Sequence, residues 1–159
     1  MLDNNTHEAV CVIDLDTIMP GSILFDYGDA IRYCVNTGAE DDPDLNNIGI
    51  DMKKFNSFTR GFLSQTASTL TPKELELMKS APAVMTLELA IRFLSDYLDG
   101  NKYFKCDPNR PDHNLDRTKT QLKLYEEFRK HEKDMDKSIQ KIYNECMRKS
   151  TPTKKTKTR

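Results

Sequence analysis

The chain has 159 residues, of which 37% are hydrophobic and 31% are charged, and its formal net charge at pH 7 is −1. This length and apolar content suit one ordinary domain with its own core. The balanced charge favours neither a nucleic acid nor a membrane surface as a partner, and no apolar run approaches the roughly 18 residues that span a bilayer.

Basic residues gather at the C-terminus. The last twelve residues, RKSTPTKKTKTR, hold six Lys or Arg and no acid, so the first 147 residues carry a net charge of −7. This tail has low complexity and no aromatic residue. We therefore predict that residues 148–159 form a basic, disordered, solvated tail, in preference to a nucleic-acid-binding arm.

The four cysteines are scattered and form no CxxC pair. This spacing indicates reduced thiols, with neither a disulfide framework nor a zinc site. The N-terminus, MLDNNTHEAV, is polar and acidic and shows no secretory signal. We expect a cytoplasmic protein.

The first predicted element is a β-hairpin. Two apolar runs, MLD and AVCVIDLD, flank NNTHE, whose Asn and Thr suit a turn. The first run has three residues, fewer than the usual five or six of a strand, which suggests a chain that begins partway through a hairpin. A frayed terminal strand is the alternative. We expect the strand over residues 10–13 to be buried.

A bundle of about five helices is predicted to follow the hairpin, which makes the fold mainly α. The sequence TPKE at 71–74 predicts a capping box, with Thr71 as the cap, Pro72 in the first turn and Glu74 closing the box. Two faces are predicted to be apolar. The helices are predicted over 26–38, 51–68, 72–81, 83–100 and 115–147, with Phe55, Phe58, Phe62 and Leu63 on one face of the second, and Leu122, Tyr125, Phe128, Met135, Ile139 and Ile142 along the last.

Aspartates follow the predicted strand. Side chains alternate along a strand, so Asp14 and Asp16 would share one face. Two adjacent carboxylates repel each other, and a divalent cation relieves that repulsion. Proteins bind Mg²⁺ through one or two carboxylates together with substrate phosphates. The pattern predicts a magnesium–phosphate site in residues 1–25, and a solvated acidic loop is the alternative.

Two enzyme families have an Asp-x-Asp at the end of an apolar strand. In haloacid-dehalogenase-type phosphatases the pair supplies a nucleophile and a general acid on a Rossmann-like sheet. Here Thr17 follows the second aspartate where those enzymes usually have Gly, and no second apolar strand is evident after residue 25. This family is the weaker match.

The segment VIDLDTIMPGSILFDYGDAIR more closely resembles the metal-binding segment of the aminoglycoside phosphotransferase and choline kinase family, which has a protein-kinase-like fold. The segments FTRGFL, LELAIRFLSDYLDGNKYFK and HNLDRTKTQLKLYEE are similar to the bacterial N-acetylhexosamine kinase branch of that family, in the same order. The resemblance extends to about residue 130. It implies the C-terminal lobe of a sugar kinase that uses Mg²⁺ and ATP, with the acceptor site in the helical region 26–147.

The resemblance also implies roles for five residues. Asp14 takes the place of the aspartate that binds the Mg²⁺ bridging the nucleotide phosphates, and Asp16 assists it. Asp26 corresponds to the acid that braces the catalytic loop. Arg92 and Tyr103 would face the sugar hydroxyls.

Asp29 is a weaker candidate for the role of Asp26. Arg92 also has a structural interpretation, because it lies four residues from both Glu88 and Asp96 and could form a helix-face ion pair. Tyr103 could simply pack in its loop.

Two parts of such a kinase are not found in this sequence. The family's catalytic loop, with an aspartate that accepts the hydroxyl proton, would precede the predicted hairpin. His113 and Asn114 lie in a different place and have no aspartate beside the asparagine. The nucleotide lobe is not found either.

We therefore expect the chain to be inactive in isolation and to belong to a longer or two-part kinase, whose other part or a second copy would cover the apolar residues 10–13. A non-catalytic helical interaction module is the alternative.

Overall fold

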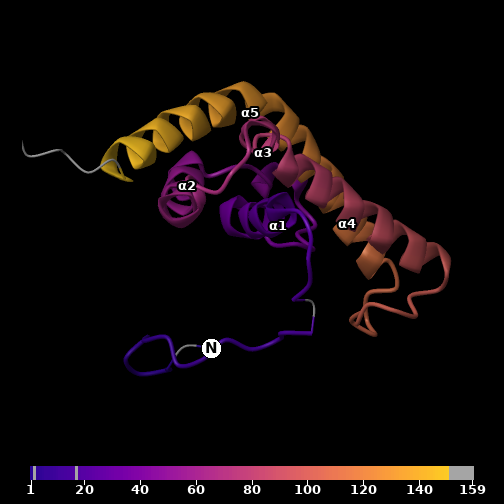
Figure 1. Ribbon diagram of the computed structural model, residues 1–159. Coiled ribbons are helices and arrows are strands. Elements are labelled where there is room, and N and C mark those ends of the chain that lie inside the picture. The colour runs from indigo at the N-terminus through magenta and orange to yellow at the C-terminus, as the bar shows by residue number, and fades with distance from the viewer. Residues whose placement is uncertain (2, 17, 151–159) are drawn as a thin grey trace, which may run out of the picture.

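The computed structural model describes residues 1, 3–16 and 18–150, and the prediction of a mainly α fold is confirmed. Within these residues there are five α-helices and one short 3₁₀ helix, and no β-strand. Figure 1 shows the long last helix lying across the others, with α4 beside it. The elements are α1 (Ile23–Val35), η1 (Leu45–Asn47), α2 (Met52–Thr66), α3 (Pro72–Leu77), α4 (Ala81–Leu98) and α5 (His113–Ser150).

The predicted N-terminal hairpin is wrong as a pair of strands. Backbone hydrogen bonds from Asp3 N–H to the Glu8 carbonyl (2.9 Å) and from Val10 N–H to the Met1 carbonyl (3.1 Å) close a turn. However, Val10, Val12 and Ile13 are 65%, 79% and 58% exposed, so the segment is not buried as expected. The cause is visible in Figure 1, where the N-terminal segment runs away from the helices and none of the described helices covers it.

Side-chain caps fix where three helices begin. The Ser22 hydroxyl accepts the Leu24 N–H at the start of α1, and the Asp51 carboxylate accepts the N–H groups of Lys53 and Lys54 at the start of α2. The capping box predicted at residues 71–74 is confirmed at the start of α3. These caps satisfy amide groups that have no partner inside their own helix.

The core lies between α5 and the other helices, because α5 packs along both α4 and α2, and α1 packs on α4. The predicted apolar face of the second helix is confirmed: Phe55 and Leu63 are fully buried, while Phe58 and Phe62 pack at the edge. On α5 the prediction is wrong at Leu122, which is 42% exposed. The buried residues of α5 follow one another at intervals of three, four or seven positions, and they are Leu124, Phe128, Met135, Ile139 and Ile142. Leu122 lies two positions before Leu124, so its side chain points to another side of the helix.

The helix α5 also exceeds its predicted bounds, starting at His113 and reaching Ser150. The predicted disordered tail therefore overlaps its last turn, and residues 151–159 lie outside the described part of the chain. None of the described helices has both the length and the apolar content that crossing a membrane requires.

Gly28 marks the closest approach of α1 to α4. A Cβ at this position would lie 2.8 Å from the Ala81 carbonyl oxygen and 2.8 Å from Met85 Cγ. The backbone of Ala81 opens α4 and cannot move aside as a flexible side chain would. The two helices can therefore pack at this distance only because residue 28 has no side chain.

We predict that Gly28→Ala lowers the free energy of unfolding by about 1–3 kcal/mol, because it overpacks the α1–α4 contact. The matched control is Gly61→Ala in the exposed part of α2, where an added Cβ meets nothing within 4 Å. That change should stabilise the chain by about 0.5–1 kcal/mol through helix propensity. Urea unfolding followed by circular dichroism measures both, and equal effects of the two substitutions would contradict the close contact.

Candidate functional site

Arg92 and Tyr103, assigned by resemblance to the sugar site, lie together in the structure. Arg92 lies on the outer face of α4, and Tyr103 lies in the loop that joins α4 to α5. The guanidinium carbon of Arg92 is 5.7 Å from the centre of the Tyr103 ring and 5.4 Å from that of Phe104. This distance is within the range of a cation–π contact, so the two predicted residues form one cluster.

The ion-pair interpretation of Arg92 is only partly correct. Its Nε lies 3.7 Å from the Glu88 carboxylate, and both side chains are about half exposed. Asp96, the other candidate partner, binds elsewhere. An exposed pair at this distance holds the arginine weakly, and the guanidinium stays accessible to a ligand.

Asp96 holds the loop that carries Tyr103. Its carboxylate accepts the backbone N–H groups of Lys102 (2.9 Å), Tyr103 (2.8 Å) and Phe104 (2.9 Å). It also accepts a hydrogen bond from Nδ2 of the fully buried Asn114, at 2.8 Å. One side chain thus fixes three consecutive residues of the loop against the end of α4.

These bonds also decide the ionisation of Asp96. Burial by itself would raise the pKa of this carboxyl. The N–H groups of Phe104, Tyr103 and Lys102 and the amide of Asn114 outweigh that effect and hold the pKa below its ordinary value. Asp96 is therefore a charged structural anchor, and its oxygens are already occupied by protein donors.

A hollow of about 430 Å³ opens at this cluster. It combines the Arg92 donors, the carboxylate of Asp99 and two aromatic rings. Those rings, Tyr103 and Phe104, are 4.9 Å apart in an edge-to-face arrangement. The lining residues are Ile91, Arg92, Ser95, Asp96, Asp99, Tyr103 and Phe104.

The predicted metal-binding aspartates lie on the exposed N-terminal segment. Asp14 and Asp16 are both exposed, and Asp14 has a φ of 63°, in the left-handed region that aspartate tolerates better than most residues. This turn interrupts the extended backbone from which the shared face was predicted. The part of the chain that the structure describes contains no cluster of three or more His, Cys, Asp or Glu suited to a metal ion.

The two carboxylates fit magnesium in chemistry, because Mg²⁺ needs only one or two protein carboxylates when phosphates and water complete its shell. Asp26 lies in the first turn of α1, where a negative charge is favourable at a helix N-terminus. It is exposed and lines a second hollow, of about 650 Å³, beside Met19 and Met85. Within the described residues, no hydrogen bond or ion pair connects these aspartates with Arg92 or Tyr103.

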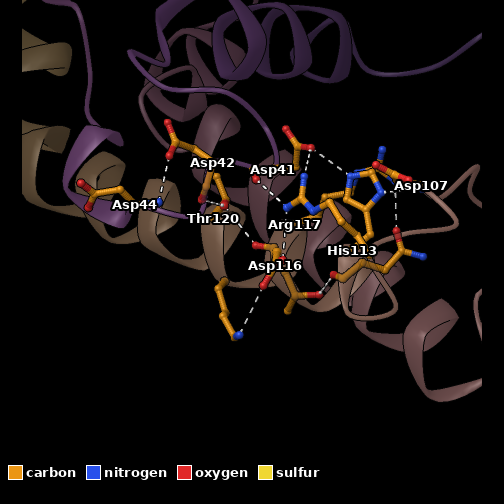
Figure 2. Close-up of polar contacts among 12 residues, drawn as sticks. Asp41, Asp42, Asp44, Asp107, His113, Asp116, Arg117 and Thr120 are labelled. Atoms are coloured by element: carbon orange, nitrogen blue, oxygen red, sulfur yellow. Dashed lines mark hydrogen bonds and ion pairs between the residues drawn. The ribbon is translucent and has the colours of Figure 1, made fainter.

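A separate polar cluster fastens residues 39–44 to the start of α5 (Figure 2). Arg110 donates from Nη1 to the Asp41 carboxylate (2.7 Å) and from Nη2 to the Asp116 carboxylate (3.2 Å). His113 Nε2 is 3.0 Å from the same Asp41 oxygen. Burial alone would raise the pKa of Asp41, but the bonds from His113 and Arg110 lower it overall.

His113 resembles a catalytic base in its pairing with an aspartate, but its geometry gives it a structural role. Its Nδ1 accepts the Asp107 N–H at 3.0 Å, so Nε2 carries the proton that is donated to Asp41. Both ring nitrogens are thus engaged by protein groups.

Sequence reasoning missed Phe104 and Asp99 as residues of this hollow, and it missed that Asp96 anchors the loop. Phe104 adjoins the predicted Tyr103, so its proximity to the site was the available signal. The anchoring role of Asp96 had no signal, because its partners are mostly backbone amides.

A comparison of the chain with models of known protein families finds no match.

We predict that acid destabilises the chain through Asp96. Because the folded pKa of this group is lowered, its contribution is complete above the ordinary value of 3.8 and is lost as the pH falls through the folded pKa. Urea midpoints measured from pH 7 to pH 3 should therefore fall less steeply for Asp96→Asn, which starts less stable at pH 7.

The control is Asp134→Asn, which removes an exposed α5 carboxylate held only by a 3.4 Å pair with Lys137. It should leave the pH profile of the wild type nearly unchanged. Parallel profiles for wild type and Asp96→Asn would contradict the anchoring role.

Proposed function

We propose that this chain is the C-terminal part of a Mg²⁺- and ATP-dependent sugar kinase whose acceptor is an N-acetylhexosamine. The helical region supplies the acceptor site at Arg92 and Tyr103. The N-terminal segment supplies the metal-binding carboxylates Asp14 and Asp16. The nucleotide lobe and the catalytic aspartate come from outside the 159 residues.

The observation that carries this proposal is the contact between Arg92 and Tyr103. The resemblance assigns both residues to one sugar site, although they are eleven positions apart in different elements. Their side chains meet at a hollow with a carboxylate and a second ring. An arrangement in which Tyr103 packed elsewhere would have removed this support.

The hollow suits the chemistry of a sugar. Each hydroxyl both donates and accepts hydrogen bonds, so recognition needs donors and acceptors side by side. Arg92 supplies donors, the Asp99 carboxylate supplies acceptors, and the rings of Tyr103 and Phe104 supply apolar area for the ring carbons. A few convergent polar groups on an aromatic wall are typical of small-molecule sites.

When bound, Mg²⁺ neutralises phosphate charge that develops in phosphoryl transfer. Asp14 and Asp16 would hold it as part of a shell completed by phosphate oxygens and water. Asp26, close in sequence to this segment, adds negative charge at the start of α1. Asp14 and Asp16 would bind and orient the metal, whereas Asp26 would brace the catalytic loop that holds the proton acceptor for the sugar hydroxyl.

The alternative of a non-catalytic interaction module is favoured by one observation. The apolar side chains Val10, Val12, Ile13, Ile18 and Met19 are all more than half exposed. Such a run marks a surface that another chain can cover. The phosphatase interpretation requires a parallel sheet, and the absence of any strand from the described residues argues against it.

We predict that the isolated chain binds N-acetylhexosamines and that Arg92→Ala weakens this binding several-fold to about tenfold. Each lost hydrogen bond to a neutral hydroxyl contributes about 0.5–1.5 kcal/mol. Titration calorimetry with N-acetylglucosamine and N-acetylgalactosamine measures the change.

The matched control is Arg129→Ala, which removes an exposed α5 arginine paired with Glu132 at 3.2 Å. This substitution should leave the sugar affinity unchanged. If Arg92→Ala and Arg129→Ala behave alike, Arg92 is only a helix-face ion pair and the acceptor site is wrongly placed.

We also predict the effect of Asp14→Asn once a nucleotide lobe with the catalytic loop is supplied, in the same polypeptide or as a second one. Turnover should fall by about a hundredfold or more, with little change in sugar affinity, because the metal acts on charge that grows in the transition state. Steady-state kinetics with varied sugar at saturating Mg-ATP separates the two effects. Full activity of Asp14→Asn would exclude Asp14 as a metal ligand.

A further inference from the structure

We propose that a hollow between α1, α2 and α5 binds a small organic anion, with a carboxylate or phosphate group on an apolar or aromatic body. The hollow has a volume of about 860 Å³. This hollow is separate from the one at Arg92 and Tyr103, with which it shares no lining residue, so it does not depend on the proposed kinase function. It is lined by Arg32, Tyr33, Cys34, Asn36, Gly38, Ala39, Glu40, Lys54, Ser57, Phe58 and Gln121.

Arg32 supplies a buried cation at this hollow. Its side chain is only 11% exposed. Nε donates to Asp29 (2.9 Å), and Nη1 donates to Glu40 (3.2 Å) and weakly to Gln121 Oε1 (3.5 Å). No acceptor in the described part of the chain reaches Nη2. One edge of the guanidinium fork therefore retains donors for a ligand.

Gln121 supplies a second donor. The residue is 1% exposed, and its Oε1 faces Arg32, as it must because arginine only donates. No described group accepts from Nε2. Among the described residues, two fully buried side-chain polar atoms have no hydrogen-bond partner, Asn56 Oδ1 and Arg117 Nε. Gln121 Nε2 is not one of them although it also has no partner, so this atom must be exposed to open space. Since the residue is otherwise buried, that space is the hollow it lines.

Lys54 completes the set of donors. It is exposed near the start of α2, lines the hollow, and has no ion-pair partner within the described residues. Within the described residues, the hollow thus presents the Lys54 ammonium, Nη2 of Arg32 and Nε2 of Gln121 as donors without an acceptor, while the Arg32 charge is paired with two carboxylates, those of Asp29 and Glu40. A buried amide donor without an acceptor is costly, and a ligand rich in acceptors would remove that cost.

Glu40 occupies the place that the ligand anion would take. It belongs to the loop after α1, and its side chain is 39% exposed. The Arg32 guanidinium remains paired with Asp29 when Glu40 leaves, and the half-exposed Glu40 carboxylate returns to water, so a ligand anion can replace it without leaving a buried charge unpaired. The oxygens of a carboxylate or phosphate can accept from Nη1 and Nη2 of Arg32 and from Nε2 of Gln121, while Nε of Arg32 stays bonded to Asp29.

The wall of the hollow selects the rest of the ligand. Phe58 lies on it, backed by stacking on Phe62 with ring centres 6.4 Å apart. Cys34 and the exposed ring of Tyr33 lie on the α1 side. A free inorganic ion would leave these groups uncovered, whereas a ring or short apolar body would cover them.

The test is titration of the full chain by calorimetry and NMR with four probes: phenyl phosphate, benzoate, inorganic phosphate and phenol. Phenyl phosphate or benzoate should bind at one saturable site, at least tenfold tighter than phenol and tighter than inorganic phosphate. The tighter of the two organic anions identifies the phosphate or carboxylate class. Equal binding of phenol, or no binding of either organic anion, would overturn the proposal.

Three substitutions locate the binding. Gln121→Met keeps the volume, removes the buried donor and should weaken the better anion about tenfold. Lys54→Gln, at an exposed position that leaves folding intact, should weaken it several-fold. Glu40→Gln removes the competing carboxylate and should strengthen it.

The anion site is excluded if the affinity is unchanged in Lys54→Gln and does not rise in Glu40→Gln, because an anion bound elsewhere would respond to neither. These outcomes leave the sugar-binding test untouched. Failure of sugar binding would likewise leave this site standing.

Discussion

The burial of one face of α5 governs the packing of the other helices. The buried stripe of this 38-residue helix reaches from Leu124 to Ile142, and both α4 and α2 lie against it. Cross-helix ion pairs such as Lys79 with Asp136 (3.4 Å) and Arg60 with Glu145 (2.6 Å) are half-exposed and contribute little. Apolar burial therefore holds the bundle, and the polar cluster around Asp41 and His113 sets where α5 begins. Helix α1 packs on α4, at a distance that the missing side chain of Gly28 allows, and on α2, where the Tyr27 hydroxyl is 2.8 Å from that of Thr59.

The end of α4 and the loop before α5 together create the hollow beside Arg92 and Tyr103. The connecting loop must turn back sharply, and the Asp96 carboxylate gathers three of its amides at the point of the turn. Asn114, in the first turn of α5, donates to the same carboxylate, so the loop and the helix share one anchor. This anchor places the rings of residues 103 and 104 over Arg92. The contact of Arg92 with the two rings therefore depends on the hydrogen bonds to the Asp96 carboxylate, which would all be lost together if that carboxylate were removed.

Periodicity and capping predicted the helices because both are local signals. The Thr71–Glu74 box and the apolar face of α2 are written in neighbouring residues, and both are confirmed. The hairpin prediction was wrong because an apolar, β-branched run becomes a strand only when a sheet partner and a covering layer exist. The anchor at Asp96 could not be predicted, because its partners are backbone N–H groups, which nearly every residue has whatever its side chain. The Asp41–His113 contact joins residues 72 positions apart, beyond any local pattern.

The acceptor half and the metal half of the proposed kinase site differ in how firmly the chain holds their side chains in place. Arg92 and Tyr103 are held by a helix and by an anchored loop, so any ligand of this hollow would meet groups already in place and would need to order little of the chain. Asp14 and Asp16 lie on an exposed segment whose apolar side chains contact no covering element. Fixing such a segment around a metal costs about 1–2 kcal/mol per ordered residue before any bond to the ion is counted. In the proposed kinase, the helical region would therefore contribute a pre-arranged acceptor site, whereas metal binding would depend on a surface that covers the N-terminal segment and orders the two aspartates.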